Sequence, residues 1–416
     1  MRSRRSLTSK LHPRRRSKLS RLLGGALALI ETTLSISSGY LLLLLLAARR
    51  SAGGEATDVD IEQSQRLRIV VLVPAHNEQA SIAAAVQSLL RCAYPQARRR
   101  VVVIADNCDD RTAQLATAAG AEAWERVDES RRGKGFALAW ALARLQAERA
   151  EFDAVVTVDA DCTVSRNLLS AIDDRLRGGA EAVQVNYLAA NPEASTAAAL
   201  RFAGFALVNT VRFLGKQRLG LSCGLVGTGM AFTRDLLRRE AWRDVGLVED
   251  GEYHMRLVLA GERTEFVREA WVSSPMPSKL GTSAEERWEQ GRLELIRRWA
   301  PRLILSGLAR RDIVRLHTGL ECLVPPQSLI AAAGLGSVAA RLLVGPRRLV
   351  GLATACLVAQ VVFVLGGLRL VRAPAAVYRA LLSAPALIAS KSLLYVRLAC
   401  GRGPTTWVRT ERDADA

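Results

Sequence analysis

Two carboxylates follow a short apolar run in the segment FDAVVTVDADC, residues 152–162. Side chains two positions apart on an extended backbone share a face, so Asp159 and Asp161 can both reach one cation. Carboxylate oxygens suit Mg²⁺ or Mn²⁺, and such an ion suits a substrate that carries phosphate. Taken alone, the segment is equally compatible with a solvated turn after a strand, so the interpretation depends on its surroundings.

Polar residues also follow other apolar runs. In PAHNE, the backbone of Pro74 and Ala75 is placed to reach a base, and Glu78 to accept hydrogen bonds from ribose hydroxyls. Asp106 ends the next apolar run and is placed to accept from a base N–H. Lys134 lies between two glycines just before a predicted helix, and these glycines favour a role in binding a diphosphate over a basic surface loop.

Alternating strands and helices position these groups between residue 67 and about residue 190. Such alternation predicts an α/β fold with a mostly parallel sheet covered on both faces, whose ligands lie outside the carboxyl ends of the strands. The polar segments fall at those ends, which favours the metal interpretation of Asp159 and Asp161 over the solvated turn. We predict strands at 68–73, 100–105, 121–126, 154–158 and 182–186, and helices at 81–92, 112–119, 135–148 and 166–176.

The following part of the chain is expected to be more helical. We predict a long helix at 195–216, a glycine-rich loop leading into a strand at 221–233, and helices at 249–260 and 282–299. The helix at 249–260 opens with Glu249 and Asp250, which would also be favourable simply as negative charges at a helix N-terminus.

Composition and charge indicate a membrane protein. Half of the residues are apolar and the net charge is +18, with nine Lys/Arg and no acid in a basic tail at 1–21. Because the tail runs into an apolar stretch at 22–48, we predict contact with anionic lipid and no nucleic-acid partner. About 20 apolar residues span a bilayer, so 22–48 is predicted to be a transmembrane helix, followed by a linker at 49–66.

The C-terminal region, 301–416, carries further apolar segments and a polar tail. Two spans are predicted, at about 323–344 and 349–371, while 374–398 is predicted to be an interfacial helix or a weak span. The seven cysteines are scattered without a CxxC pair, which argues against a disulfide framework or a zinc site.

The ordered motifs VLVPAHNE, DNCDD, RRGKGFAL, DADC, GTGMAF and VED resemble those of family 2 glycosyltransferases, over residues 67–300. The resemblance implies an inverting enzyme with a GT-A fold, a Rossmann-like nucleotide-diphospho-sugar transferase domain. By that resemblance Glu78, Asp106 and Lys134 contact the nucleotide. Asp159 binds the nucleotide on its diphosphate or ribose side, and Asp161 ligates the divalent metal, Mg²⁺ or Mn²⁺.

The same resemblance assigns the acceptor and catalytic groups. Gly227, Thr228 and Gly229 would line the acceptor site. Glu249 and Asp250 match the catalytic acid motif, with Asp250 as general base. The chemistry is consistent, because attack of a hydroxyl on an anomeric carbon needs a base for the proton and stabilisation of the departing diphosphate.

The segment at 283–299 resembles the QxxRW motif of membrane polysaccharide synthases. Arg287 would meet the diphosphate and Trp288 would stack on an acceptor sugar, but Ala284 stands where Gln is expected. The arrangement of spans around the domain is similar to cellulose, chitin and hyaluronan synthases.

We therefore predict a multi-pass enzyme of the inner (plasma) membrane that transfers sugar from a nucleotide-diphospho-sugar to a lipid-linked or growing glycan acceptor. Nucleotide sugars are cytosolic, which places the catalytic domain on the cytoplasmic side, although the basic tail then has no account. The alternatives are a processive polysaccharide synthase, which the missing Gln disfavours, and a catalytically inactive scaffold that retains the fold.

Overall fold

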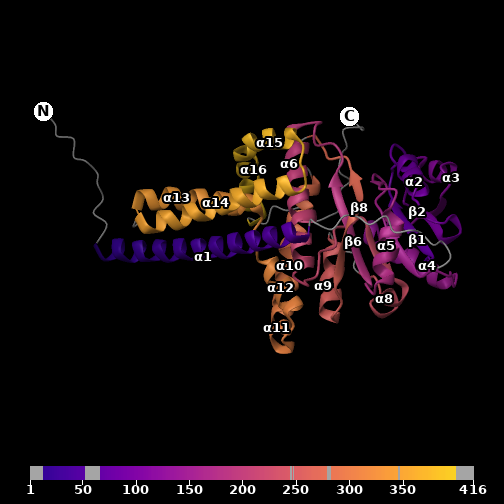
Figure 1. The fold of residues 1–416 in the computed structure, drawn as a ribbon, viewed down its shortest axis with the longest axis horizontal. Helices are drawn as coiled ribbons and strands as arrows, with labels where there is room; N and C mark the ends of the chain where they lie inside the picture. Colours follow the sequence, from indigo (N-terminus) through magenta and orange to yellow (C-terminus); the bar gives the residue numbers. More distant parts are fainter. Residues whose placement is uncertain are drawn as a thin grey trace.

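The computed structural model describes residues 13–51, 66–243, 246, 248–278, 283–344 and 347–399. The basic tail up to residue 12, most of the linker and the polar end of the chain therefore lie outside the described residues. A sheet covered by helices forms one part of the molecule, and three apolar helices extend from one side of it (Figure 1).

The sheet has eight strands in the order β3-β2-β1-β4-β7-β6-β8-β5. Its first half, β3 to β4, is parallel as predicted, but β7 runs antiparallel to both β4 and β6, so the whole sheet is mixed rather than mostly parallel. The strands are β1 (Ile69–Ala75), β2 (Arg99–Asp106), β3 (Glu122–Arg126), β4 (Ala154–Thr157), β5 (Thr163–Val164), β6 (Ala182–Ala189), β7 (Met230–Thr233) and β8 (Thr264–Ser274).

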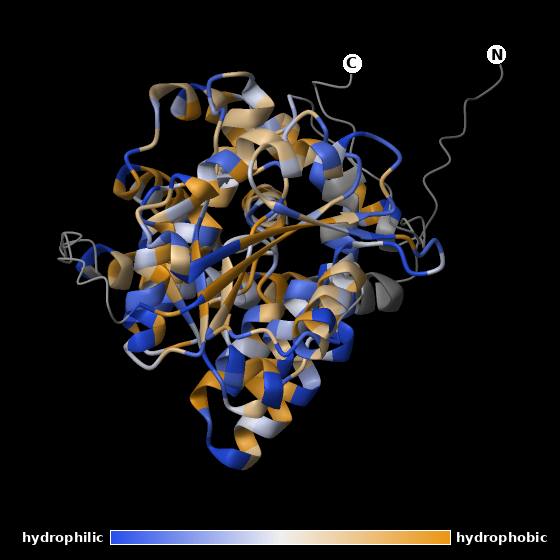
Figure 2. Ribbon diagram, turned by 90° about the vertical axis from the view of Figure 1, so that its right-hand side faces the viewer, coloured by the Kyte–Doolittle hydropathy of each residue, from blue (hydrophilic) through white to orange (hydrophobic). Residues whose placement is uncertain are grey.

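Alternation of side chains along β1 supplies two cores. Ile69, Val71 and Val73 point to the face covered by α2 (Ile82–Leu90) and α5 (Leu168–Arg177), with α3 (Thr112–Ala118) at its edge. Val70 and Leu72 point to the face covered by α4 (Lys134–Ala147), α8 (Arg234–Arg239) and α9 (Glu249–Ala260). Figure 2 shows largely hydrophobic strands surrounded by helices in which hydrophilic and hydrophobic residues alternate. Four predicted helices over residues 81–176 are therefore confirmed.

Three helices of the described residues are long and apolar enough to cross a membrane: Gly24–Arg50, Thr196–Arg218 and Val350–Leu370. The first belongs to α1 (Pro13–Ser51), which is a single helix through the predicted span. The second combines α6 (Thr196–Phe205), a π-helical segment (Ala206–Arg212) and α7 (Phe213–Arg218), and 72% of it is buried inside the protein. This second helix runs along the sheet, whereas the other two extend away from it (Figure 1).

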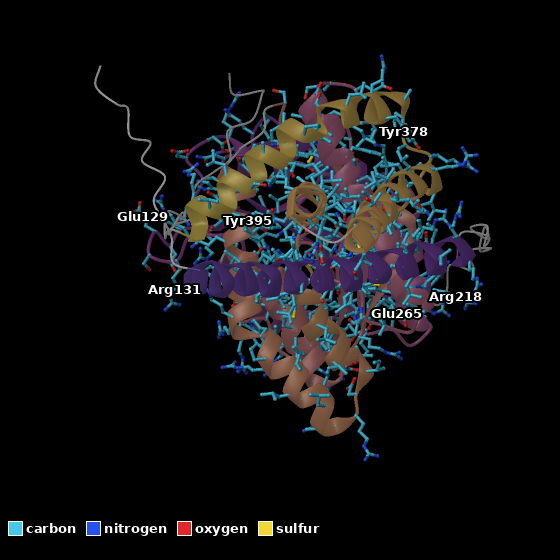
Figure 3. The ribbon with its side chains drawn as sticks, turned by 90° about the vertical axis from the view of Figure 1, so that its left-hand side faces the viewer. Glu129, Arg131, Arg218, Glu265, Tyr378 and Tyr395 are labelled. Atoms are coloured by element: carbon cyan, nitrogen blue, oxygen red, sulfur yellow. The ribbon has the colours of Figure 1, made fainter. Side chains whose placement is uncertain are left out.

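The predicted C-terminal spans coincide with α13 (Gln327–Val344) and α14 (Arg347–Leu370). Residues 374–398 do not form one helix, because a short 3₁₀ turn separates α15 (Ala375–Ala380) from α16 (Ala384–Ala399). Seen from the side of the apolar helices, Tyr378 and Tyr395 of these last helices lie above α1 (Figure 3). The remaining helices, α10 (Ser283–Arg298), α11 (Ala300–Arg310) and α12 (Ile313–Cys322), lie between the sheet and α13 in the chain.

Polar side chains join the apolar helices to one another. Arg341 of α13 donates two hydrogen bonds to Glu31 of α1, each of 2.7 Å, and both side chains are buried. Gln360 of α14 donates to the hydroxyl of Ser38 at 2.6 Å. Because an unpaired buried charge is costly, these contacts hold α1, α13 and α14 in one register.

Candidate active site

The parallel half of the sheet brings three of the predicted polar segments to one edge. β1 lies between β2 and β4, and all three strands run in the same direction. The backbone of Pro74 and Ala75 ends β1, Asp106 ends β2, and Asp159 follows β4 by two residues. Segments that are far apart in the sequence therefore meet at the same edge of the sheet, where open α/β sheets bind their ligands.

Lys134 connects three of the segments. Its ammonium group, at the first residue of α4, donates to Asp159 Oδ1 at 2.5 Å and to the carbonyl oxygen of Gly227 at 2.7 Å. Burial alone would lower the pKa of Lys134, but the nearby carboxylates of Asp159, Glu249 and Asp250 raise it above its ordinary value. Lys134 is therefore a permanent positive charge among three carboxylates.

The loop before β7 is held from beneath by Gln184 of β6. The Gln184 amide donates to the carbonyl of Thr228 at 2.8 Å and accepts from the N–H of Val226 at 3.0 Å. The fully buried hydroxyl of Thr228 accepts from the N–H of Asp159 at 3.1 Å, which ties the loop to the end of β4. Sequence reasoning missed Gln184, since a polar residue inside a buried strand was its only signal.

Two glycines of this loop face in different directions. Gly227 has φ +85°, and a methyl group there would lie 3.4 Å from both Asp250 Oδ2 and Lys134 Nζ. Gly229 has φ +66°, and a methyl group there would lie 2.3 Å from a methyl of Val185. Gly227 thus faces the charged groups, whereas Gly229 is pressed against the core.

Glu249 and Asp250 form the first turn of α9. Burial and the charge of Asp250 raise the pKa of Glu249 to about 7, against the opposing effect of Lys134. Burial likewise raises the pKa of Asp250, which Lys134 and the N–H of Gly251, 2.7 Å from Asp250 Oδ1, counteract. Carboxylates that titrate closer to neutrality are better matched to general-base chemistry.

Asp159, Asp161 and Cys162 offer three potential ligand atoms within 4.8 Å of one another. Burial and the two carboxylates raise the pKa of the Cys162 thiol well above its ordinary value, so it stays protonated and is a poor ligand. The remaining donors are carboxylate oxygens, the set that suits Mg²⁺ or Mn²⁺. The residues present therefore fit a hard divalent ion.

Asp106 has a partner that sequence reasoning missed. Arg126, its register partner at the end of β3, donates to Asp106 Oδ1 at 2.5 Å, and both side chains are buried. The amide of Asn107 donates to the same oxygen at 3.0 Å. These donors hold the carboxylate in a fixed orientation at the edge of the sheet.

Glu78 is buried at the start of α2. Its N–H donates to the hydroxyl of Thr112 at 2.8 Å, and its carboxylate accepts from Ser81 at 2.9 Å. Arg287 and Trp288 fall within the backbone of α10, but their side chains lie outside the described residues. The roles predicted for these residues, as for the glycines and Thr228, remain predictions.

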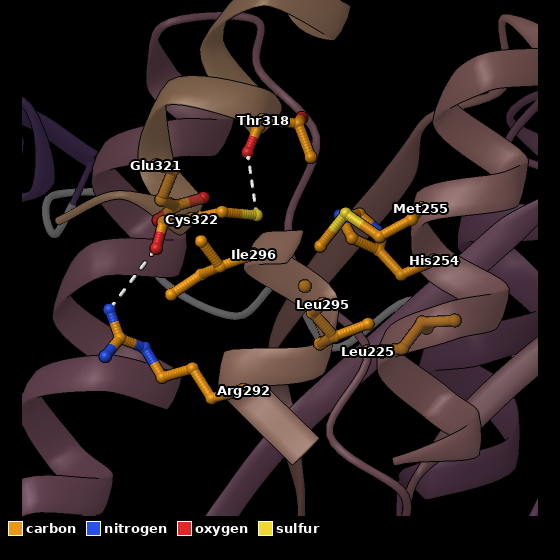
Figure 4. A pocket seen from close by; sticks show the side chains of 11 residues that line it. Leu225, His254, Met255, Arg292, Leu295, Ile296, Thr318, Glu321 and Cys322 are labelled. Atoms are coloured by element: carbon orange, nitrogen blue, oxygen red, sulfur yellow. Dashed lines mark hydrogen bonds between the residues drawn. The ribbon is translucent and has the colours of Figure 1, made fainter. Parts of the chain in front are cut away.

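A cavity of about 200 Å³ adjoins α9 (Figure 4). It lies between α9, α10 and α12, and Gly251, the residue after Asp250, lines it. Most of the other walls are apolar, among them Leu225, Met255 and Leu295. The hydroxyl of Thr318 in its wall is buried and has no hydrogen-bond partner. The cavity thus joins the carboxylate end of α9 to the helices that lead into α13.

Comparison with known proteins identifies the family and the fold. The family described as "Glycosyltransferase like family 2" matches residues 66–291, and the chain belongs to this family. The fold is the mixed α/β, Rossmann-like GT-A fold.

The "Probable glycosyltransferase YdaM" of Bacillus subtilis (strain 168) is 25% identical over 247 residues, which cover 54% of this chain and 55% of that protein. The chain thus spans about half the length of this curated relative.

Two solved structures are similar. One is the mannosyltransferase PcManGT from Pyrobaculum calidifontis in complex with GDP-Man and Mn²⁺, 20% identical, covering 82% of this chain and 97% of that one, with a TM-score of 0.54. The other is glucosyl-3-phosphoglycerate synthase from Mycobacterium tuberculosis with Mg²⁺ and UDP, 23% identical, covering 49% and 69%, with a TM-score of 0.35. The first supports the fold.

Proposed function

We propose that the protein is a membrane-bound, inverting glycosyltransferase that moves a sugar from a nucleotide-diphospho-sugar to a lipid-linked or growing glycan acceptor. The observation that carries the proposal is the meeting of Lys134, Asp159, Gly227 and Asp250, since a methyl at Gly227 would touch both Lys134 and Asp250. A cation for a diphosphate and a base for a hydroxyl thus lie side by side.

Asp250 is the general base of the proposed reaction. It takes the proton from the acceptor hydroxyl as that oxygen attacks the anomeric carbon. One displacement inverts the anomeric centre, so no enzyme nucleophile is required. Glu249, with its pKa near 7, adjoins Asp250 in the same buried turn and sets the pH range in which the pair is ionised.

Lys134 supplies a fixed positive charge on the side of the departing diphosphate. Asp161 and Asp159 would hold Mg²⁺ or Mn²⁺, which when bound neutralises negative charge on the diphosphate oxygens. The similar solved structure in complex with GDP-Man and Mn²⁺ supports a donor and metal of this kind.

The nucleotide is assigned to the edge of the sheet formed by the carboxyl ends of β1 and β2. The backbone of Pro74 and Ala75, with Asp106, would contact the base, and Glu78 the ribose. Arg287 of α10 would reach the diphosphate, and Trp288 the acceptor sugar. Donor selectivity then depends on Asp106, whose orientation Arg126 fixes.

We assign the catalytic domain to residues 67–300, flanked by spans in α1, α13 and α14, in the inner (plasma) membrane with the domain facing the cytoplasm. The lengths of α1 and α14 support spans there, because at 1.5 Å per residue α14 measures about 36 Å and a bilayer core about 30 Å. The apolar cavity beside Gly251 supports an acceptor that approaches from the side of the membrane.

The test is Asp250→Asn in the full chain, with Asp235→Asn as the matched control, since Asp235 lies on α8 with its side chain 74% exposed. We expect the first variant to lose transfer by at least about 100-fold, as loss of a general base does, while donor binding by calorimetry is retained. An inactive scaffold predicts instead that Asp250→Asn leaves every phenotype intact.

Two further measurements separate the remaining alternatives. Asp161→Ala should abolish metal-dependent transfer. An unchanged rate of transfer in the presence of metal would show that the metal lies elsewhere. Short products from a radiolabelled donor are expected, and a long polymer would establish a processive synthase.

A further inference from the structure

Helices α11 and α12 form a hairpin that carries exposed apolar side chains on one face. Leu305 and Leu308 of α11 are 67% and 60% exposed, and Ile313 of α12 is 65% exposed. Spacing of three residues places Leu305 and Leu308 on one side of α11. Side chains of this size are seldom so exposed together unless another apolar phase covers them.

The opposite face of the hairpin is anchored to the catalytic helix. Leu303 and Trp299 pack against Met255 and Val258 of α9. Arg315 donates to the carbonyl of Val258 at 3.2 Å, and its side chain is buried. The apolar face is therefore the one turned away from α9.

The two helices of the hairpin fit closely against each other. A methyl group at Gly307 would lie 2.5 Å from the backbone nitrogen of Leu316, so the two backbones are almost in contact there. Asp312 caps α12 by accepting from the N–H groups of Val314 and Arg315. The exposed side chains thus belong to a rigid element.

The hairpin lies across the direction of the apolar helices. Pro325 and Pro326 break the chain after α12, and the axes of Ile313–Cys322 and Gln327–Leu343 differ by 65°. α11 and α12 project to one side of α1, at a steep angle to it, on the side of the sheet from which α1 and α14 extend (Figures 1 and 3). If α13 crosses a bilayer along its normal, the 65° bend places α12 closer to the plane of the membrane surface than to that normal.

Cations accompany the exposed apolar residues. Arg302, Arg310 and Arg311 are exposed, and residues 300–311 contain no Asp or Glu. Arginine side chains beside an apolar face can extend to lipid phosphates while leucines enter the acyl boundary. An anionic leaflet, which attracts basic segments at its surface, matches this combination of charge and apolarity.

We propose that the α11–α12 hairpin docks on the surface of an anionic bilayer, with Leu305, Leu308 and Ile313 in the headgroup–acyl boundary and the arginines on lipid phosphates. This inference rests on the proposed membrane location of the enzyme. Because the other face of the hairpin packs against α9, docking sets the distance of Asp250 from the membrane that carries the acceptor.

The test places the photo-crosslinking residue p-benzoylphenylalanine at single positions of the full chain, reconstituted in vesicles of phosphatidylglycerol and phosphatidylcholine with a radiolabelled tracer lipid. Leu308→p-benzoylphenylalanine reports on the hairpin. Val361 on α14, 55% exposed, reports on the proposed span, and Val127 after β3, 85% exposed, is the control away from the membrane. We expect lipid labelling from positions 308 and 361 and none from 127.

The charge requirement is tested with the same probes. Labelling from 308 should fall at least about threefold in pure phosphatidylcholine and in the Arg310→Ser/Arg311→Ser variant, while labelling from 361 stays constant. Labelling at 361 with none at 308, or with protein adducts at 308, would overturn the docking surface alone. No lipid labelling at either position would overturn the membrane location itself, and equal labelling of 308 in both vesicles would refute the arginine–lipid contact.

Discussion

Three glycines with left-handed backbone conformations allow the strain of an added methyl group to be separated from its surroundings. Gly220, Gly227 and Gly229 have φ of +70°, +85° and +66°. An L-residue in this region costs about 1–2 kcal/mol, so each Gly→Ala variant carries that strain. At Gly220 no atom lies within 4 Å of the added methyl. Gly220→Ala therefore measures the strain alone.

Gly229→Ala should be the most destabilising of the three. Its methyl would lie 2.3 Å from Val185 Cγ2 and 2.9 Å from Val272 Cγ2, and both valines are fully buried. Overpacking of a core adds about 1–3 kcal/mol to the strain. At about 2–4 °C per kcal/mol, we expect melting temperatures of the detergent-solubilised protein to fall by about 2–8 °C for Gly220→Ala and roughly twice as far for Gly229→Ala.

Gly227→Ala should separate activity from stability. Its methyl would lie in ordinary contact distance, 3.4 Å, from Asp250 Oδ2 and Lys134 Nζ, so the melting temperature should match that of Gly220→Ala. The methyl occupies the space between base and cation, and a misplacement of about 1 Å can cost about 100-fold in rate. We expect kcat to fall about 10- to 100-fold. Equal kcat values for the two variants would refute the placement of Gly227 in the active site.

Three further predictions concern titration and burial. In a pH–rate profile, the transfer rate should rise with pH through about 7 as Glu249 ionises. Lys134→Met removes a positive charge that lowers the pKa of Glu249 and of Asp250, so this rise should move to higher pH in the variant. Since the pKa of Glu249 in the folded protein exceeds its unfolded value of 4.5, ionisation opposes folding, so Glu249→Gln should raise the melting temperature at pH 8 and leave it nearly unchanged at pH 4. Glu31→Leu should lower the melting temperature more than the double variant Glu31→Leu/Arg341→Leu, because the single change leaves a buried charge unpaired; additive effects would contradict this pairing.

The local elements could be predicted from the sequence because their patterns are local. The helix predicted at 249–260 coincides with α9, and the five strands predicted before residue 190 correspond to β1, β2, β3, β4 and β6. The strand predicted to follow the glycine-rich loop corresponds to β7. Strand β8 was missed, although it pairs with β6 over eight positions. Its residues carry charges among the apolar ones, which hides the period of two on which strand prediction depends.

Patterns in the sequence identify which chemical groups are available and place three of them at the carboxyl ends of predicted strands. Apolar runs that stop at Ala75, Asp106 and Asp159 carry this information locally. The folded structure was needed to show that Arg126 pairs with Asp106, that Gln184 holds the Gly227 loop against Lys134, and that the apolar face of α11 points away from α9. The physical reason is that these contacts depend on strand register and helix packing between residues far apart in the chain, for which a single sequence holds no periodic signal.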